Sequence, residues 1–517
     1  MRLRLAILIA GLTSFISVSM EIMWIEIISY ITKGHAGIFG AVLGLVLTGI
    51  ALGSRYGYRK SKDQVSSSAN LLPELLTLGA TINFFGLIAI LLWVKVHDAF
   101  VGLLFIQVVV VSYYLGAIFP VLCKLAVSDK EESVGQETSW IYAGNIIGST
   151  AGPLFTGYVL MDNLSPAITI CIMSGAALLL ALIIINGNVD GIKKRLKDSI
   201  FVVTLILLIP IGYLTVLSTM MERFHFLSSF ADWTSFRYQE HSRQGIITVL
   251  PRPKGADVFL GGGAYDGDVN TDPENNVNGI TRCYMIGSMH RKPSKVLMIG
   301  LSTGSWAQVL ANYKLIDSLT IVEIQPAYIN LIKKYGEISP LLSNPKVKII
   351  IDDGRRWMRR NQNEKFDFIV MNTTFHWREH STNLLSIEFL RMAKNHLNEK
   401  GVMYWNTTGS KDVMYTAANA FKYVTSVANF VAASDAPFDM TKAEREKNYP
   451  YFFRNSVPAF EKNDSTRVIR NKLINAELPV LRDSLLKQNY WLITEDNMAS
   501  EYKSGVWSRI MKFKNSF

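Results

Sequence analysis

The stretch VLMIGLSTGSWAQVL, residues 296–310, decides how the C-terminal half of this 517-residue chain folds. Its apolar start has the length of a buried strand, and SWAQVL resembles the first turns of a helix. Between them, Gly300 and Gly304 allow a tight turn and a close approach of the backbone to a ligand. The stretch predicts a strand–loop–helix unit, whose loop is either a cradle for a nucleotide-like cofactor or only a tight turn.

Four further apolar runs follow this unit, at residues 318–324, 347–352, 366–372 and 401–406. They alternate with segments long enough for crossover helices, which predicts a mostly parallel sheet with helices on both faces over residues 295–517. Ahead of it, GIITVL and ADVFLGGG are short strand candidates. They predict a small β-hairpin subdomain and entry segment at residues 223–294.

Acidic residues stand where two of these strands end. Glu323 follows the glycine loop by about 20 residues, at the spacing where a carboxylate accepts hydrogen bonds from ribose hydroxyls. Asp352 and Asp353 end the third strand, where an acid could accept from an adenine amino group. Because ligands bind beyond the carboxyl ends of such strands, the acids favour the cofactor cradle. The alternative is a capped helix with solvated acids.

The N-terminal part is predicted to be a transmembrane domain, residues 1–222. The chain has 49% hydrophobic residues, and apolar runs of roughly 18 to 25 residues can cross a bilayer. About seven such runs lie near residues 5–31, 36–53, 71–94, 99–125, 139–161, 166–186 and 199–219. The lipid bilayer is therefore an expected partner, and a multi-pass protein of the inner cell membrane is the expected localisation.

Basic residues predict the orientation of these spans, because Lys and Arg concentrate in cytoplasmic loops. One set of loops carries Arg2, Arg4, Arg55, Arg59, Lys60, Lys62, Lys124, Lys130, Lys193, Lys194, Arg195 and Lys197. The opposite loops carry only Lys33 and Lys95. The N-terminus is therefore expected in the cytoplasm. Seven crossings would place the chain after Arg223 on the outer face, whereas one re-entrant run among the seven would place it in the cytoplasm, so its side stays open.

Two polar features lie within the apolar runs. Glu21 and Glu26 fall in the first run, where an ionisable group is either functional or paired inside the helix bundle. Glycines recur at roughly four-residue spacing in YAGNIIGSTAGPLFTG, namely Gly144, Gly148, Gly152 and Gly157. Such spacing allows two helix backbones to pack closely.

The motifs VLMIGLSTGSWAQVL, LTIVEIQP, IIIDDGRRWMRR and ITEDNMASEYK resemble those of spermidine/spermine synthases, especially the membrane-fused, spermidine-synthase-like proteins. The resemblance implies a Rossmann-like methyltransferase fold that binds S-adenosylmethionine or its decarboxylated form. It places Gly300 and Gly304 at the amino-acid end of the cofactor, Glu323 at the ribose and Asp353 at the adenine. The segment SRQGIITV resembles the hairpin of the family. The predicted cofactor site comprises Gln244, Gly300, Ser302, Gly304, Glu323, Asp352 and Asp353.

The chain departs from this family just after the fourth strand, in IVMNTTFHWREHSTNLL. Asn372 and Phe375 stand where the family has the acids that position and deprotonate an attacking amine. His376 is the predicted base, with Asn372 and Glu379 as further catalytic candidates, because an imidazole can accept a proton near neutral pH. The alternative is that this histidine is a surface loop residue. Trp377 either stacks on a ligand or packs in the core.

These features predict a membrane-anchored transferase that passes an aminopropyl or methyl group to a small-molecule acceptor, for which a polyamine is one candidate. The alternative is a sensor, a transport-coupled protein or an outer-face envelope-modifying enzyme that reuses the fold. Nucleic acid is not an expected partner, since the basic run DGRRWMRR lacks the repeated aromatic residues that are interleaved with basic ones in single-strand-binding surfaces. The three cysteines lack metal-ligand spacing, so no metal site is expected. A homo-oligomer is possible, and the sequence does not decide the oligomeric state.

Overall fold

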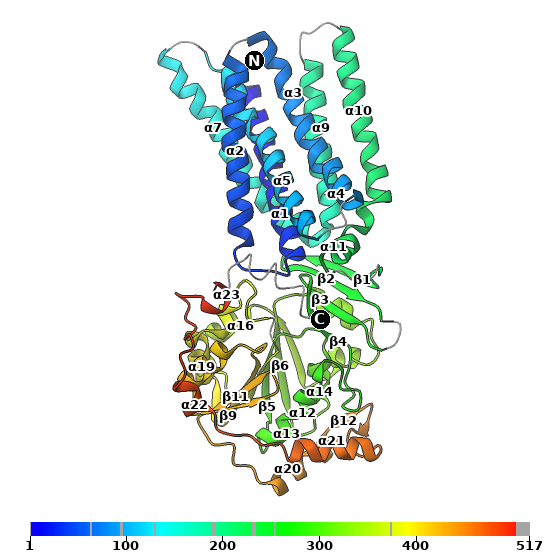
Figure 1. Cartoon of the computed structure of the whole chain (residues 1–517), viewed down its shortest axis with the longest axis vertical. Helices are drawn as coiled ribbons and strands as arrows, with labels where there is room; N and C mark the ends of the chain where they lie inside the picture. Colours follow the sequence, from blue (N-terminus) through cyan, green and yellow to red (C-terminus); the bar gives the residue numbers. More distant parts are fainter. Residues whose placement is uncertain are drawn as a thin grey trace. The chain divides into compact units, whose positions relative to one another are not determined.

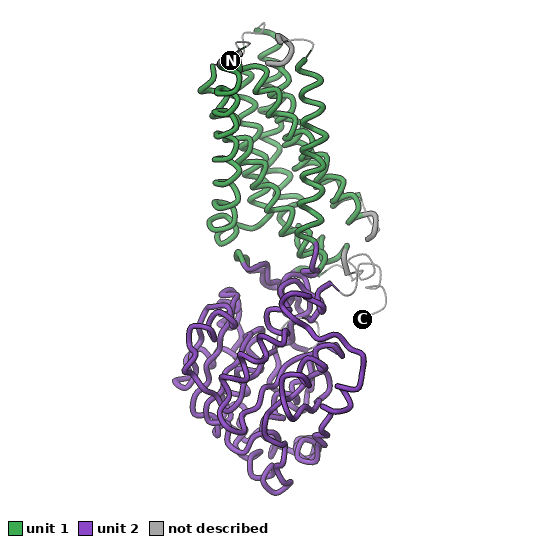
Figure 2. The backbone as a smooth tube through the Cα atoms, turned by 90° about the vertical axis from the view of Figure 1, so that its left-hand side faces the viewer, with its two compact units in different colours: residues 1–32, 38–235, 241–243 green, residues 33–37, 236–240, 244–517 purple. Residues whose placement is uncertain are grey.

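The computed structural model describes residues 2–62, 65–93, 97–128, 131–187, 192–229, 234–252, 255–372 and 375–502. By their contacts the residues form two compact units (Figure 2). Unit 1 comprises residues 1–32, 38–235 and 241–243. Unit 2 comprises residues 33–37, 236–240 and 244–517.

Unit 1 consists of helices that lie side by side (Figure 1). In chain order they are α1 (Leu3–Ile31), α2 (Ile38–Lys62), α3 (Val65–Thr81), α4 (Leu87–Trp93), α5 (His97–Gly116), α6 (Ile118–Ala126), α7 (Glu131–Phe155), α8 (Met161–Asn163), α9 (Pro166–Gly187), α10 (Ile192–Thr215) and α11 (Met220–Ser229). Two π-helical turns, η1 (Ile82–Gly86) and η2 (Thr156–Leu160), join α3 to α4 and α7 to α8.

Six helical segments in the described part of the chain are long and apolar enough to cross a membrane: Leu3–Ile31, Ile38–Lys62, Asn70–Trp93, Phe100–Ala126, Pro166–Gly187 and Ile192–Leu227. The expected span at 139–161 is also helical, in α7, η2 and α8, but it is not among the six. Its Gly, Ser, Thr and Asn residues make it more polar than the other runs.

Glycines allow α7 to pack closely on α1. A Cβ atom at Gly144 would lie 2.6 Å from the carbonyl oxygen of Ile7, and one at Gly148 would lie within van der Waals overlap of Gly11. One at Gly152 would lie 2.5 Å from the carbonyl oxygen of Phe15. Because the contacts advance by four residues on both helices, α1 and α7 are parallel. The glycine spacing thus has the packing role that the sequence predicts, except at Gly157, where a Cβ would meet nothing within 4 Å.

Unit 2 is built on a seven-stranded sheet with the order β10-β11-β9-β8-β5-β6-β7. Its strands are β5 (Lys295–Ile299), β6 (Ser318–Glu323), β7 (Val347–Ile351), β8 (Phe366–Met371), β9 (Leu397–Asn406), β10 (Tyr423–Val427) and β11 (Phe430–Ser434). The pairs among β5 to β9 are parallel, whereas β11 pairs antiparallel with β9 and β10. The five predicted strands are confirmed, and the sheet is Rossmann-like.

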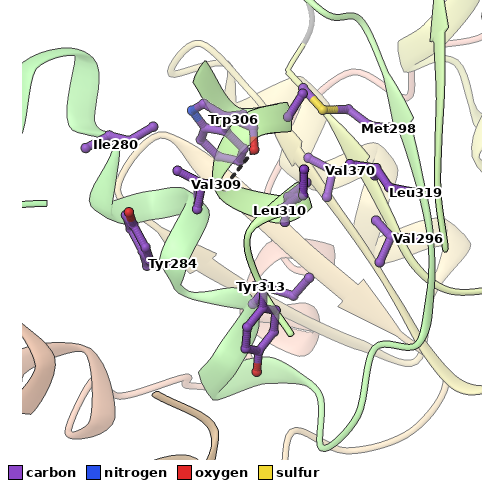
Figure 3. Packing of buried hydrophobic residues seen from close by; sticks show 14 of the residues in the cluster. Ile280, Tyr284, Val296, Met298, Trp306, Val309, Leu310, Tyr313, Leu319 and Val370 are labelled. Carbon is purple, nitrogen blue, oxygen red and sulfur yellow. Dashed lines mark hydrogen bonds between the residues drawn. The ribbon is translucent and has the colours of Figure 1, made fainter. Parts of the chain in front are cut away.

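Both faces of this sheet are buried, which explains why its central strands are continuously apolar. In β5, Val296 and Met298 belong to one core cluster, and Leu297 and Ile299 belong to the other. Figure 3 shows the first cluster, in which Trp306, Val309 and Leu310 of α14 (Ser305–Ala311) pack with the strands. The helix that follows the glycine loop is therefore fixed by its buried residues.

The remaining helices of unit 2 are short. They are α12 (Thr281–Tyr284), α13 (Ile286–Met289), α15 (Ala327–Ile332), α16 (Gly354–Arg360), α17 (Thr382–Leu385), α18 (Ile387–Asn395), α19 (Lys411–Ala420), α20 (Lys442–Asn448), α21 (Asp464–Ile474), α22 (Arg482–Leu486) and α23 (Ala499–Tyr502). A four-stranded sheet precedes the main one, with the order β1 (Tyr238–Ser242), β2 (Gly245–Leu250), β3 (Val258–Gly261) and β4 (Ala264–Asp268). Strands β12 (Phe453–Arg454) and β13 (Val457–Pro458) form a small pair.

Substitution of Gly148 by Ala should destabilise unit 1, because the new Cβ would overlap the backbone of Gly11 and force α1 and α7 apart. We expect a loss of about 1–3 kcal/mol, the usual effect of overpacking. Thermal unfolding of the full chain in detergent measures it. Gly157→Ala is the matched control, since the space around Gly157 is open. Equal melting temperatures for the two variants would contradict the close α1–α7 packing.

Candidate functional site

A cavity of about 340 Å³ lies in unit 2 at the carboxyl ends of the parallel strands. Seven of the residues that the sequence singles out line it: Gln244, Gly300, Ser302, Glu323, Asp353, Asn372 and Glu379. Glu323 ends β6, Gln244 lies in the turn before β2, and the other five lie in the loops that follow β5, β7 and β8. The sheet therefore brings together residues that are far apart in the chain.

The glycine loop borders this cavity through only part of its length. Gly300 has a φ of 85° and faces the carbonyl oxygen of Asn372, which would lie 3.2 Å from an added Cβ. Ser302 also has a left-handed backbone, with a φ of 50°, and its hydroxyl donates to the carbonyl of Asp266 at 2.9 Å. Gly304 precedes α14 and packs against the side chain of Ile332. Gly300 and Ser302 form the cavity wall, whereas Gly304 has a packing role.

The carboxylate of Glu323 connects the loops after β5 and β6. It accepts hydrogen bonds from the backbone N–H of Leu301 at 2.5 Å and from that of Gln325 at 2.7 Å. Burial raises the pKa of Glu323 to about 7, although the two backbone donors act in the opposite direction. Near neutral pH this residue is therefore present in both protonation states, and a ligand can shift the balance between them.

The two acids after β7 have different environments. The carboxylate of Asp353 lines the cavity and also caps α16, since it accepts from the backbone N–H of Arg356 at 2.7 Å. Asp352 forms ion pairs with Arg356 and Arg360 and is not among the described residues that line the cavity. The geometry supports Asp353 as a ligand contact and gives Asp352 a role in fixing the helix behind it.

The predicted catalytic residues do not all meet at the cavity. Asn372 and Glu379 line it, but His376 is absent from the described lining, and its Nδ1 lies 2.5 Å from the hydroxyl of Thr408. The imidazole that lines the cavity is that of His380, which the sequence analysis did not select. Its Nε2 lies 3.3 Å from Glu379, which raises the pKa of His380. Thr373 and Thr374 lie outside the described residues.

Trp377 stacks on protein rings rather than standing alone. Its ring centroid lies 5.4 Å from that of Phe375 and 6.1 Å from that of His35. Both neighbours belong to unit 2 together with the 375–380 loop. These contacts favour the packing interpretation of Trp377.

Among the other cavity residues, Asp266 and Tyr328 were missed by the sequence analysis, whereas Arg378 lies in the stretch IVMNTTFHWREHSTNLL that it singled out. The hydroxyl of Tyr328 donates to the carboxylate of Asp266, and the guanidinium of Arg378 lies close enough to affect the same carboxylate. Burial raises the pKa of Asp266, whereas Tyr328 and Arg378 counteract this effect. The hairpin segment on which the family resemblance rests, residues 242–249, does not include Asp266 or Tyr328.

The β1–β4 sheet contributes to the cavity wall through Gln244, Gly261 and Gly262. The side-chain amide of Gln325 donates to the carbonyl of Gly245 at 3.0 Å and connects this sheet to the loop after β6. The ring of Tyr328 is nearly parallel to that of Phe259, with centroids 6.5 Å apart. A small ligand at the strand ends would therefore be enclosed by both sheets.

Residues 283–438 match the Spermine/spermidine synthase domain. A polyamine aminopropyltransferase of Buchnera aphidicola subsp. Acyrthosiphon pisum is 35% identical over 115 residues, which are 22% of this chain and 40% of that protein. One of Sulfurisphaera tokodaii is 27% identical over 174 residues, 32% of this chain and 57% of that protein. The matches thus span about half the length of these relatives.

A solved spermidine synthase in complex with the transition-state analogue AdoDATO is 19% identical, with a TM-score of 0.36, and the alignment covers 49% of this chain and 84% of that one. The family match and the names of these relatives agree on the same family. The C-terminal part of this chain therefore carries a spermine/spermidine synthase domain.

Proposed function

We propose that the chain is a membrane-anchored transferase whose unit 2 binds S-adenosylmethionine or its decarboxylated form and transfers a methyl or aminopropyl group to a small-molecule acceptor. The observation that carries this proposal is the cavity at the strand ends, where Gly300, Glu323 and Asp353 line one space. Such a space, at the carboxyl edge of a parallel sheet, is where α/β folds bind nucleotides.

Each of these residues offers a contact that suits part of an S-adenosyl group. The left-handed turn at Gly300 and Ser302 brings the backbone to the cavity wall. Glu323 can accept from ribose hydroxyls in its ionised form, since each carboxylate oxygen takes more than one hydrogen bond. Asp353 uses one oxygen to cap α16, and its carboxylate keeps acceptor capacity for an adenine amino group.

The proposed acceptor side of the cavity has Asn372 where the family has an acid, and its lining also includes Glu379 and His380. A sulfonium substrate supplies its own leaving group, so the protein has only to orient the acceptor and take its proton. Glu379 or His380 is the group placed for that proton, because both line the cavity. A polyamine remains a candidate acceptor through the names of the relatives, which are polyamine aminopropyltransferases.

The number of membrane crossings favours a second candidate function. If α1 crosses the bilayer, the parallel helix α7 beside it crosses too, which makes seven crossings with the six apolar segments. Seven crossings put residues 33–37 and the chain after α10 on one side, and residues 33–37 and 244–517 both belong to unit 2. With the basic loops in the cytoplasm, that side is the outer face. The second candidate is an outer-face envelope-modifying enzyme or sensor that reuses the fold.

Substitutions at two strand ends test the ligand. Calorimetry on the full chain in detergent should detect methylthioadenosine, and Glu323→Ala or Asp353→Ala should each weaken its binding by about tenfold to a hundredfold, the loss expected for a charged hydrogen bond. Asp352→Asn is the matched control, because Asp352 stands outside the lining. Identical affinities for the wild type and both alanine variants would remove the site assignment.

Binding should also depend on pH. A ribose that donates to Glu323 requires the ionised carboxylate, whereas burial holds the pKa of the free group at about 7. Affinity should therefore rise as pH increases from 5 to 7, by up to about tenfold per pH unit, and level off above 7. In Glu323→Gln this slope should disappear. A slope that persists in the variant would assign the titration to another group.

Reporter fusions distinguish the two candidates, because S-adenosyl compounds are made in the cytoplasm. A fusion at Phe517 should report a cytoplasmic C-terminus if the transferase proposal holds. The opposite result is a fusion at Phe517 that reports the outer face while a fusion after Lys62 reports the cytoplasm. It would rule out an S-adenosyl substrate and support the outer-face candidate. The Lys62 fusion serves as the internal reference, since seven crossings place it on the side opposite to Phe517.

A further inference from the structure

A second cavity, also of about 340 Å³, lies within unit 1, where α9 packs against both α3 and α10 (Figure 1). Its volume falls in the range of about 300–1,000 Å³ that is typical of small-ligand pockets. The lining comes from residues 70–78 of α3, from Ile185 near the end of α9 and from residues 194–202 in the first turns of α10. None of these residues belongs to the site in unit 2, so this cavity needs an explanation of its own.

One part of the lining carries charges of both signs in equal number. Glu74 and Asp198 supply two carboxylates, and Lys194 and Arg195 supply two cations. The side chains of Glu74, Arg195 and Asp198 form no ion pair or hydrogen bond with any other residue that the structure describes, although all three face the same space. The cavity therefore offers a ligand both hydrogen-bond donors and acceptors.

The other part of the lining is apolar and lies deeper in the spans. Leu78 follows Glu74 by one helical turn, and Phe201 and Val202 follow Asp198 by one turn. Phe201 is 58% exposed within a helical segment that is apolar enough to cross a membrane, where its surroundings would be acyl chains. A ligand that fills this cavity would thus have a charged head and an apolar tail.

The charged part of the cavity stands at the end of the helices that carries the basic loops. Lys62 ends α2 just before α3, and Lys193 and Lys197 lie in the first turns of α10. Basic residues concentrate on the cytoplasmic side of a membrane, which assigns this end to the cytoplasmic leaflet. Basic pockets between helices on that side are a known setting for lipid head groups.

We propose that this cavity binds a phospholipid whose head group carries a primary amine, such as phosphatidylethanolamine. Arg195 would bind the phosphate, since a guanidinium pairs with two phosphate oxygens at once. Glu74 and Asp198 would accept from the ammonium group. An acyl chain would lie along Phe201. The inference uses the membrane anchoring in the proposed function and is independent of the transfer reaction.

The balance of charge identifies this class of head group among the lipids. Two cations with two carboxylates match a zwitterion, whereas an anionic head group without an amine would leave both acids without a partner. A quaternary ammonium has the same charge as a primary one but has no N–H to donate to a carboxylate. We therefore expect phosphatidylethanolamine to bind more tightly than phosphatidylglycerol or phosphatidylcholine.

Native mass spectrometry of the full chain in detergent tests this order with the three lipids, all with identical acyl chains. The wild type should retain one phosphatidylethanolamine with about tenfold higher affinity than the other two, the lower end of the range for a charged hydrogen bond. Soluble glycerophosphoethanolamine has the same head group without acyl chains and should not displace the lipid. Displacement by it, or equal affinity for all three lipids, would overturn the proposal.

A single cation in the lining provides a matched pair of variants. Arg195→Gln should weaken the binding of phosphatidylethanolamine by about tenfold to a hundredfold, because the phosphate loses a charged donor. Lys197→Gln removes the same charge from an exposed position of α10 outside the described lining, and it should leave the affinity unchanged. Equal losses in the two variants would show that only the overall charge matters, which contradicts a site at Arg195.

The acids give a readout that a misfolded protein could not produce. In the double variant Glu74→Gln and Asp198→Asn the cavity keeps its cations and loses both carboxylates. It should bind phosphatidylglycerol more tightly than the wild type does and lose the preference for phosphatidylethanolamine. A preference that survives in this variant would mean that the acids do not recognise the amine, and the assignment would be wrong.

These outcomes are distinct from those of the proposed function. Methylthioadenosine binding is measured separately and depends on residues of unit 2. If the lipids behave as expected while methylthioadenosine does not bind, the S-adenosyl site fails and the lipid site stands. If methylthioadenosine binds while the wild type treats the three lipids alike, the lipid site fails alone.

Discussion

The carboxylate of Glu323 is the contact on which the candidate site depends. It joins the loop after β5 to the loop after β6 through the N–H groups of Leu301 and Gln325. Without this carboxylate, the left-handed turn at Gly300 and Ser302 would lose the hydrogen bond that connects it to the end of β6. The same burial that makes these hydrogen bonds effective raises the pKa of the carboxyl group. Structural support and the proposed ligand contact are thus combined in one residue.

The second feature of the site is its balance of charge. A spermidine-synthase-like cavity that served cationic amines alone would need acids around the acceptor. Here Asn372 lines that region together with one acid, Glu379, and Arg378 lies near Asp266 and Glu379. Two glycines, Gly34 and Gly262, make space for this charge. The cavity therefore combines the residues proposed to bind the nucleoside with a different set of polar groups at its other end.

Much of the fold could be predicted from local signals. The strand of residues 296–299, the glycine loop and the acids at Glu323 and Asp353 follow from apolar runs and from spacing, and the sheet brings them together as expected. The hairpin of β10 and β11 was missed, because its turn at Ala428 has a left-handed backbone without a glycine to signal it. The 139–161 helix was predicted from its apolar residues, and its parallel contact with α1 came only from the structure.

The side chains of the acceptor end could not be predicted, since their positions depend on contacts between distant segments. His376 and His380 stand four residues apart in one loop, yet only His380 lines the cavity, because His376 contacts Thr408. Arg378 is placed by Gly34, which lies more than 300 residues earlier in the sequence. No local pattern indicates which of these residues points inward.

The central claim is that the cavity at the strand ends binds an adenosyl group. Hydrogen–deuterium exchange of the full chain, with and without methylthioadenosine, tests it most directly. A bound ligand slows the exchange of the backbone amides that it contacts, so the protected segments identify the binding site. The account predicts protection of residues 300–303, 323–325 and 353–354, with no change around the separate cavity at residues 436–440. Protection confined to other segments, or none at saturating ligand, would contradict it.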